Sequence, residues 1–548
     1  MLALEPERPL GAVLDEAHIG HIQGAFGSIP HGDVAPRVGW RAKIKTLLAI
    51  LGPGLIVMVG DNDAGAFGTY TQAGQTYGTD LLWTLLLLIP VLYVNQEMVL
   101  RLGAVSGVGH ARLIVERFGK FWGAFSVIDL FLLNALTIVT EFIGITLALQ
   151  YLGVSKLWGV IAAAALVMIA GSTGDFRRFE RFSLMLVFGS LLLVPVFLYI
   201  HPPMSQIAHD FFIPRMPEGG KLSDVMLLII AIVGTTVAPW QLFFQQSYVI
   251  DKRITPRFIT YERVDLVIGI GFVIVGAVAM MAFTAAAFTG HPEFGNFTDA
   301  VGIAAGLDKY AGKAPAVMFA LALLDASIIG ASAVSLSTAY AIGDVFSLRH
   351  SLHRKATEAK AFYAVYCGLI MLAALLVLSP HTPLGLLTNA VQTLAGILLP
   401  SATVFLLLLC NDKPVLGPWV NSRALNLFTG AVIAVLVMLS IILTASVLFP
   451  AISDRQIGGI LVGGCFTGIV ATIAARYIDQ RRRETAPITV ELVDSSQLDT
   501  WRMRPLSELP PAHLTTLSRM WMIVLRGYLI VAGGLVLVRI IQLATASE

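Results

Sequence analysis

Long apolar runs are the feature of this sequence that most limits its fold. A helix needs about 20 mostly apolar residues to cross the hydrocarbon core of a bilayer. Thirteen candidate spans meet this condition, at residues 46–70, 80–100, 122–151, 156–172, 183–200, 224–250, 264–289, 315–345, 361–379, 384–410, 424–449, 457–477 and 521–543. The last contains Arg526 and Arg539, whose long side chains would have to reach the interface. The sequence therefore predicts an all-α integral membrane protein with about 11 to 13 transmembrane helices.

The charge content supports this class. Charged residues make up 13% and hydrophobic residues 56% of the 548 residues. A soluble globular chain carries about 25% charged residues, so this chain could not cover a water-soluble particle with charge. A soluble enzyme, a nucleic-acid-binding protein and a disordered scaffold are thereby disfavoured. Cys367, Cys410 and Cys465 lie in or at the end of apolar runs without metal-ligand spacing, as small buried hydrophobic residues do.

Positive charge divides the loops into two classes. Five loops contain 17 Lys and Arg residues between them, at 101–121, 173–182, 251–263, 346–360 and 411–423, whereas the alternate loops contain only six. Lys and Arg are enriched in cytoplasmic loops. We therefore expect a multi-pass protein of the cell membrane in which these five loops and the N-terminus are cytoplasmic.

Two spans are interrupted in corresponding places. The first span runs into GDNDAGA at 60–66, which places Asp61 and Asp63 at membrane depth. The sixth span contains GTTVAPWQ at 234–241, where Pro239 removes a backbone donor. Carboxylates inside a membrane are costly and mark functional sites. Broken helices in two matching halves indicate a transporter with its binding site near the midplane.

The spacing of the breaks predicts an inverted repeat. Five spans separate them, so the second unit enters the membrane from the opposite side. We expect spans 1–5 at 45–200 and spans 6–10 at 201–411, preceded by a polar cytoplasmic tail at 1–44. Residues 412–548 would add C-terminal spans around a polar cytoplasmic linker at 478–518. We expect the tail to be solvated and mobile, although its histidines could also bind a metal: His18, His21 and His31.

The residues around the breaks resemble the Nramp family of divalent-metal transporters. The similar segments are GPGLIVMVGDNDAGAFGTYTQAGQTYGTDLLW at 52–83, QEMVLRLGAVSG at 96–107, EFIGITLALQYLG at 141–153, VGTTVAPWQLFFQQS at 233–247 and VQTLAGILLPSA at 391–402. The resemblance covers residues 40–411. It implies a LeuT-like fold of two inverted five-helix repeats, a divalent cation as transported substrate, the lipid bilayer as surroundings, and neither a cofactor nor an obligate protein partner.

The resemblance also implies site residues. The family's metal-binding aspartate falls on Asp63. Gly60 and Thr235 fall where the family offers backbone carbonyl groups. Gln392 falls on a glutamine that closes over the ion, although a hydrogen bond between helices is an equal alternative. The family's asparagine and methionine ligands fall on two alanines, Ala66 and Ala238.

Other polar residues keep two interpretations. Asp61 is either a second, water-mediated ligand or a cap of the following half-helix. Thr236 either offers its hydroxyl to a hydrated ion or bonds back to its own helix. Asp325 is an intramembrane acid that the resemblance does not place. For Glu97 we expect an ion pair with Arg101, four residues later on the same helix.

The two alanines bear on the choice of metal. A thioether ligand favours softer transition metals, whereas Mg²⁺ prefers oxygen. Mg²⁺ also keeps several waters and is usually held by one or two carboxylates. Loss of the sulfur and the amide leaves a wider site, which suits partly hydrated Mg²⁺ and resembles the Nramp-related magnesium transporters. We expect Mg²⁺ as the main substrate and Mn²⁺ as a further candidate.

Proton coupling is not expected. The family's histidine and the asparagine after it fall on Trp240 and Gln241. Its pair of acids on the third helix falls on Ile138 and Glu141, so only one acid remains. At 100 mV a divalent cation gains about 4.6 kcal/mol on entry, which permits uptake without protons. Glu141 and Asp61 remain as carboxyl groups that can bind protons.

Three other functions compete with this one. Some plant relatives that carry aluminium also have alanine at the methionine position, but they keep the histidine that Trp240 replaces. An amino-acid or amine symporter of the same fold would bind a carboxylate, which Asp63 would repel. We find no HExxH, GxSxG or phosphate loop at membrane depth, so the sequence does not suggest an enzyme.

Overall fold

Helices dominate the computed structural model, which describes residues 16–218, 221–379, 384–448, 452–484, 498–512, 515–516 and 518–527. The first half comprises α1 (Trp40–Ile50), α2 (Pro53–Val59), α3 (Ala64–Tyr77), α4 (Leu82–Ser106), α5 (His110–Phe118), α6 (Lys120–Tyr151), α7 (Lys156–Gly171), α8 (Phe176–Gly189), α9 (Leu193–Ile200) and α10 (Met204–Phe212). The second half comprises α11 (Leu222–Thr236), α12 (Pro239–Asp251), α13 (Ile259–Phe288), α14 (Ala300–Ala311), α15 (Lys313–Val345), α16 (Lys360–Leu378), α17 (Leu384–Cys410), α18 (Lys413–Leu416), α19 (Arg423–Leu448) and α20 (Asp454–Glu484). Short 3₁₀ turns occur at Glu16–His18, Ser190–Leu192, Pro256–Phe258, Gly417–Trp419 and Leu506–Glu508.

The helices confirm the predicted membrane class. Among the described residues, nine helices are long and apolar enough to cross a membrane, or up to 11 if each of two bent pairs counts as one span. The first twelve predicted spans each coincide with helical segments, of which α7 is shorter at 16 residues. The predicted span at 521–543 falls mostly outside the described residues.

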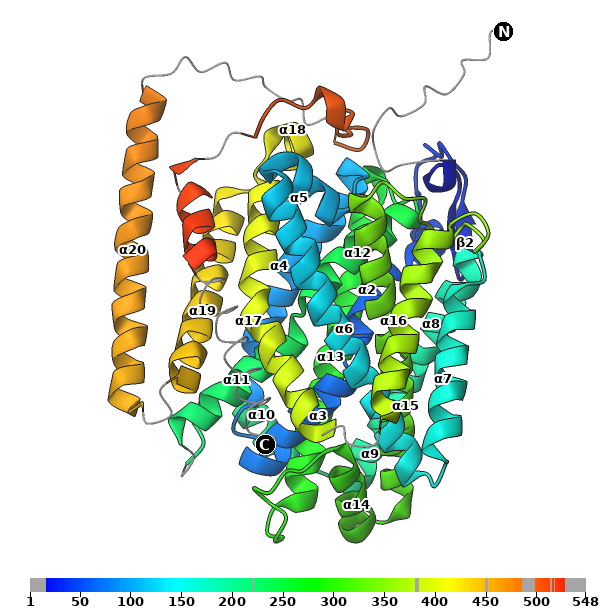
Figure 1. The fold of residues 1–548 in the computed structure, drawn as a ribbon, viewed down its shortest axis with the longest axis vertical. Helices are drawn as coiled ribbons and strands as arrows, with labels where there is room; N and C mark the ends of the chain where they lie inside the picture. Colours follow the sequence, from blue (N-terminus) through cyan, green and yellow to red (C-terminus); the bar gives the residue numbers. More distant parts are fainter. Residues whose placement is uncertain are drawn as a thin grey trace.

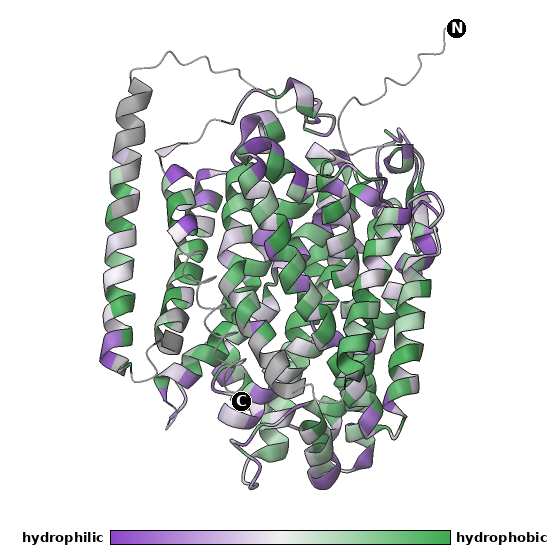
Figure 2. Cartoon of the chain, viewed as in Figure 1, coloured by the Kyte–Doolittle hydropathy of each residue, from purple (hydrophilic) through white to green (hydrophobic). Residues whose placement is uncertain are grey.

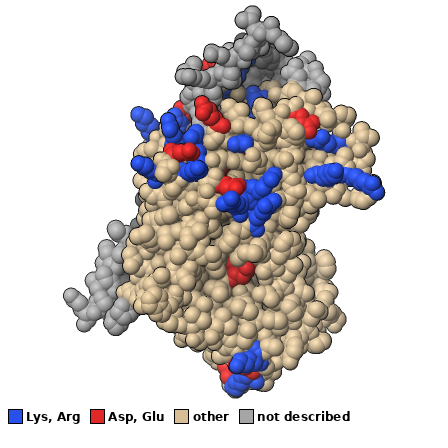
Figure 3. Space-filling model, turned by 90° about the vertical axis from the view of Figure 1, so that its right-hand side faces the viewer, with Lys and Arg blue, Asp and Glu red and all other residues tan. Residues whose placement is uncertain are grey.

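Hydropathy and charge follow the same pattern. Apolar residues cover the middle of the helices in Figure 2, and polar residues lie at their ends. On the face shown in Figure 3, Lys and Arg gather at the upper end and in a small group at the lower tip, separated by a broad band with almost no charge. We call the upper end, which contains the loops after α4, α7, α12 and α15, the basic end of the molecule.

Helices far apart in sequence form the centre of the bundle. The long helices α6 and α15 pack against each other, α13 packs against α2 and α3, and α11 packs against α17. At the margin, α20 lies against α19 (Figure 1). This arrangement encloses the short helices α2 and α3, which carry the predicted site.

One break in the first span was not predicted. Besides the expected interruption after Val59, the chain bends by 54° between α1 and α2. Gly52 there has φ 154°, a backbone conformation that favours glycine. Pro53 follows as the first residue of α2, a position where its missing N–H has no helical partner to lose.

The N-terminal tail departs from the expectation. Residues 16–18 form a 3₁₀ turn, and β1 (Ile22–Gly24) pairs with β2 (Gly27–Ile29) in an antiparallel hairpin. His18 is only 7% exposed, and the backbone N–H of His31 donates to Nδ1 of His21. The expectation of a solvated, mobile tail is therefore wrong for this segment, because arginine side chains of the bundle bind its carbonyl groups.

The predicted linker is partly ordered as well. Helix α20 continues to Glu484, and a segment near residues 498–510 lies on the basic end. Trp419 donates from Nε1 to the carbonyl of Leu498 over 3.1 Å, and Arg117 donates to that of Pro510 over 2.6 Å. Residues 485–497 lie outside the described ones.

Two glycines of α13 provide a matched test of this packing. A Cβ at Gly269 would lie 2.7 Å from the carbonyl oxygen of Gly54 and 2.9 Å from Cβ of Met58, whereas one at Gly271 would meet nothing within 4 Å. We expect Gly269→Ala to destabilise the protein by about 1–3 kcal/mol through overpacking. Gly271→Ala should be neutral or slightly stabilising. Thermal unfolding in detergent measures both, and equal effects would contradict the packing of α13 on α2.

Candidate functional site

The first helix break is organised by Asp63. Helix α2 ends at Val59, residues 60–63 are not helical, and α3 begins at Ala64. Asp63 is the N-cap of α3, where its Oδ1 accepts the N–H of Ala66 over 2.9 Å. Such a cap satisfies a backbone donor that the helix start leaves unpaired. Asp63 is 4% exposed, so its carboxyl group is held in the protein interior.

Glu141 of α6 faces this cap. Its Oε2 accepts the N–H of Ala64 over 3.2 Å, and its carboxyl group is within hydrogen-bonding reach of Asp63. Gly330 of α15 permits the approach, because a Cβ there would lie 2.7 Å from Oε2 of Glu141 and 3.0 Å from Cβ of Asp63. Ionised carboxylates are acceptors only. The pair therefore needs a proton or a cation to compensate the second negative charge.

Asp61 connects the two breaks. Its Oδ1 accepts a hydrogen bond from Nε2 of Gln241 in α12. Gln241 in turn accepts from Nε2 of Gln96 in α4 over 2.9 Å. The cap of α3 is Asp63, so Asp61 does not take the capping role left open by the sequence. Its Oδ2 is buried without a hydrogen-bond partner, which leaves an oxygen for a ligand or a water.

The second break lies between α11 and α12. Helix α11 ends at Thr236, and Ala238 stands before Pro239 at the start of α12. Thr236 donates to the carbonyl of Ile232 over 2.5 Å and lies 2.7 Å from the hydroxyl of Tyr70. Its hydroxyl is thus engaged within its own helix and with α3. The hydroxyl of Thr235 is buried and has no partner.

Gln392 of α17 lies against both breaks. A Cβ at Gly65, in the first turn of α3, would overlap the side-chain amide of Gln392. A Cβ at Gly234 in α11 would lie 2.7 Å from the carbonyl oxygen of Gln392. Gln392 is 4% exposed. Gln392 therefore lies beside residues of both breaks, and its role towards an ion stays a prediction.

The remaining predicted residues surround these groups. Gly60 is the C-cap of α2 and lies near the ring of Trp240, since a Cβ added there would be 3.6 Å from Cη2. Ala66 is fully buried and Ala238 is 6% exposed. Neither alanine side chain can act as a ligand. The structure thus brings the residues of both breaks into one buried region.

This region is rich in oxygen atoms without partners. Buried and unpaired are Oδ2 of Asp61, Oε1 of Glu141 and Oγ1 of Thr235. Within the described part of the chain, no three His, Cys, Asp or Glu side chains converge as a metal site. The arrangement therefore suits a cation bound by few carboxylates together with amide, carbonyl and water oxygens.

A small cavity adjoins the first break on the side away from the basic end. It has a volume of about 20 Å³ and is lined by Ala64, Gly68, Thr140, Gly144 and other residues as far as Asp299, before α14. The cavity is large enough for a water molecule. It reaches from the residue after Asp63 towards the loop between α13 and α14.

Two other acids lie elsewhere. Asp325 of α15 faces the end of α8, where a Cβ at Gly189 would overlap its carboxyl group. Glu97 pairs with Arg101 over 3.1 Å, as predicted, and also with Arg263 over 2.6 Å. The contacts of Gln96 and Tyr70 were not predicted, because a Gln or Tyr in an apolar run gives no indication of its partner.

Known proteins resemble this chain in sequence and in fold. A family model described as natural resistance-associated macrophage protein-like (Nramp) matches residues 54–446. The divalent metal cation transporter MntH of Deinococcus radiodurans is 28% identical over 434 residues, which cover 76% of this chain and 93% of that protein. The protein of the same name from Ralstonia nicotianae is 30% identical over 414 residues, covering 72% and 89%.

A solved structure shares the fold. A variant of the Eremococcus coleocola manganese transporter superimposes with a TM-score of 0.62 at 20% identity, covering 84% of this chain and 97% of that one. At this identity the likeness concerns the fold alone. The two chains therefore share the arrangement of their helices.

Two glycines of α3 test the position of Gln392. Gly65→Ala would displace the Gln392 amide, whereas a Cβ at Gly68 would make an ordinary contact of 3.5 Å with Thr388. We expect Gly65→Ala to weaken Mn²⁺ binding about tenfold, or about 1.4 kcal/mol, and Gly68→Ala to leave it unchanged. The measurement is the rise in Tm with added MnCl₂. The same rise in both variants would place Gln392 outside the cation site.

Proposed function

The chain belongs to the Nramp family, and from this membership we propose that it transports divalent cations across a membrane, with hydrated Mg²⁺ as main substrate and Mn²⁺ as a second. One observation carries the proposal. The two helix breaks meet in a buried region of unpaired oxygens, and the chain has alanine, not a sulfur ligand, at the start of α12.

The chemistry of the region favours a hard, hydrated ion. Asp63 provides the carboxylate, Gln392 an amide oxygen and Gly60 and Thr235 backbone carbonyls. Asp61 would act on the ion through water. Ala66 and Ala238 leave room for retained waters, which Mg²⁺ gives up reluctantly. Softer metals lose the advantage that a thioether would give them.

Transport requires access from both sides in turn. Asp61, Asp63, Thr235 and Gln392 are each at most 4% exposed, so the described conformation is closed around the site. We propose that the inverted repeats at 45–200 and 201–411 move relative to each other around it. We propose that the basic end, with the N-terminal segment, faces the cytoplasm, because Lys and Arg are enriched in cytoplasmic loops.

We further propose that transport is not coupled to protons. Trp240 and Gln241 stand where a proton relay would need a titratable side chain, and Ile138 provides no acid three residues before Glu141 on α6. Glu141 is bound to the first turn of α3, where it positions Asp63. The membrane potential alone drives a divalent cation inwards.

A second function is favoured by the relatives. Two similar proteins are named divalent metal cation transporters, and a solved structure of the same fold is a manganese transporter. A transition-metal transporter with Mn²⁺ as main substrate is therefore the alternative. The two functions differ in the ratio of Mg²⁺ to Mn²⁺ affinity.

Calorimetric titration tests the site and the substrate together. We expect Asp63→Ala to abolish binding of both Mg²⁺ and Mn²⁺, because it removes the ion's carboxylate. Asp325→Asn, which changes an acid of α15 that faces the end of α8, should bind both metals as the unmodified protein does. Unchanged binding in Asp63→Ala would refute the site, and binding of Mn²⁺ without Mg²⁺ would support the alternative.

Proton coupling is tested in vesicles. With the protein in liposomes that contain a pH-sensitive dye, an inward Mg²⁺ gradient and a negative inside potential should drive Mg²⁺ entry without a change in internal pH. Liposomes without protein, in which an ionophore sets the same potential, give the background. Internal acidification that depends on both protein and Mg²⁺ would overturn the uncoupled mechanism.

A further inference from the structure

The N-terminal segment is bound to the basic end by four arginines. Arg177 and Arg181 of α8 donate to carbonyl groups of the hairpin at Gly24, Gly27 and Ala25 over 3.0–3.3 Å. Arg253 and Arg257, after α12, donate to the carbonyls of Ala17, His21, Asp33 and Ala35 over 2.7–3.0 Å. The contacts are to backbone groups of the segment, which fix its position along the whole of 17–35.

The hairpin lies directly on α1. A Cβ at Gly24 would overlap the carbonyl oxygen of Ala49, and one at Gly27 would lie 3.2 Å from Cβ of Ala49. Ala49 is 2% exposed and Ile50 fully buried. In Figure 1 the hairpin stands at the upper right, beside α8. The hairpin covers the end of α1, next to the bend between α1 and α2.

Glu180 joins the hairpin to the bend. Its Oε2 accepts the N–H of Ala25 over 2.5 Å, and its Oε1 lies 2.5 Å from Nζ of Lys252. Lys252 also donates to the carbonyls of Ile50 and Leu51, the last residues before the bend, over 2.6 and 3.0 Å. Glu180 and Lys252 are fully buried. One carboxylate thus connects the hairpin, through a lysine, to the end of α1.

The other side of the bend is held by Asp265 of α13. Its Oδ2 accepts the N–H groups of Gly52 and Gly54 over 3.2 and 2.7 Å. Lys252 therefore binds the carbonyl end of α1, and Asp265 binds the amide end of α2. Each charge matches the helix end that it faces. The bend between α1 and α2 contains Gly52 at φ 154°. It can serve as a hinge for α1, and the side chains of Lys252 and Asp265 hold this hinge in its closed position.

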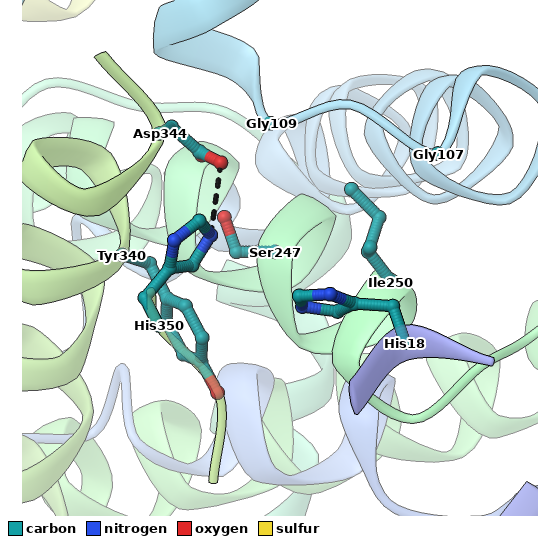
Figure 4. Close-up of a pocket in the computed structure, with 8 residues that line it drawn as sticks. All are labelled: His18, Gly107, Gly109, Ser247, Ile250, Tyr340, Asp344 and His350. Atoms are coloured by element: carbon teal, nitrogen blue, oxygen red, sulfur yellow. Dashed lines mark ion pairs between the residues drawn. The ribbon is translucent and has the colours of Figure 1, made fainter. Parts of the chain in front are cut away.

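The 3₁₀ turn adds a second anchor. His18 lies in a cavity of about 10 Å³ between the loop at 107–109, α12 and α15, as Figure 4 shows. Its ring centroid is 5.7 Å from that of His350, and its Nε2 is 3.7 Å from Oδ1 of Asp251. His350 itself pairs with Asp344 over 3.1 Å. The segment is thus held at α12 and α15 as well as at α8.

We propose that residues 16–35 form a latch that holds α1 closed at the basic end, with Glu180 and Lys252 as the positioning residues that link latch and hinge. The proposal rests on the proposed function in one respect only, that an alternating-access cycle needs α1 to move. Opening at this end then requires release of the hairpin from Glu180 and of Lys252 from the carbonyls of α1. A partner or signal that competes for the hairpin would raise the rate of opening.

Hydrogen exchange on the full chain in nanodiscs, without added cation, tests the latch independently of transport. Arg177→Ala removes two hairpin contacts. Its neighbour Arg178→Ala is the control, because that side chain is 74% exposed and, among the described residues, pairs with Asp175 three positions before it. We expect Arg177→Ala to accelerate exchange about tenfold both in 22–29 and in 41–51, with α6 and α15 unchanged. Arg178→Ala should exchange as the unmodified chain does.

A second variant addresses the link. Lys252→Met combined with Glu180→Gln removes the ion pair and both of its charges, while the buried carboxyl groups of Asp265 and Glu262 remain. We expect faster exchange in 41–51, whereas the Mg²⁺ affinity measured by calorimetry should be unchanged.

Faster exchange of the hairpin alone in Arg177→Ala, with α1 as protected as before, would overturn the latch. So would a uniform increase across all helices, which would indicate general destabilisation. Neither result would bear on the cation site at Asp63.

Discussion

The absence of water from the membrane interior is the constraint on which this structure depends. A helix that breaks there exposes backbone groups, and each needs a partner within the protein. Asp63 satisfies the start of α3, Glu141 binds the same turn, and Gln241 links Asp61 to the second break. The long helices around α2 and α3 then have to pack closely enough to exclude water, which glycines such as Gly330 permit. At the site this satisfaction is incomplete, because buried side-chain oxygens of Asp61, Glu141 and Thr235 have no hydrogen-bond partner.

We interpret the unpaired oxygens at the site as groups that bind a ligand or its water molecules. Oδ2 of Asp61, Oε1 of Glu141 and the hydroxyl of Thr235 are buried without partners, and such atoms are costly unless a ligand or water satisfies them. A cation that arrives with part of its hydration shell brings waters that can satisfy such oxygens around its ligands. An ion that needed sulfur would find only Ala238 at the start of α12. The proposed preference for hydrated Mg²⁺ follows from this chemistry, and the names of the relatives remain the argument for Mn²⁺.

The sequence predicted those features that are encoded locally. Twelve spans followed from hydropathy, and the two breaks followed from Gly, Pro and Asp in apolar runs, such as Asp63 and Pro239. Pairings between distant residues had no such signal. The bond of Gln241 to Asp61 joins residues 180 positions apart, and Lys252 meets Ile50 over 202 positions. The tail was misjudged for the same reason, because its own composition is polar and its order comes from arginines of α8 and of the loop after α12.

The central claim is that the missing thioether sets the class of metal. The most direct measurement is the ratio of Mg²⁺ to Mn²⁺ dissociation constants by calorimetry for the unmodified protein and for Ala238→Met. The account predicts that the sulfur shifts the ratio towards Mn²⁺ by about tenfold, or about 1.4 kcal/mol, because a soft ligand favours the transition metal. An unchanged ratio, with both ions still bound, would contradict it.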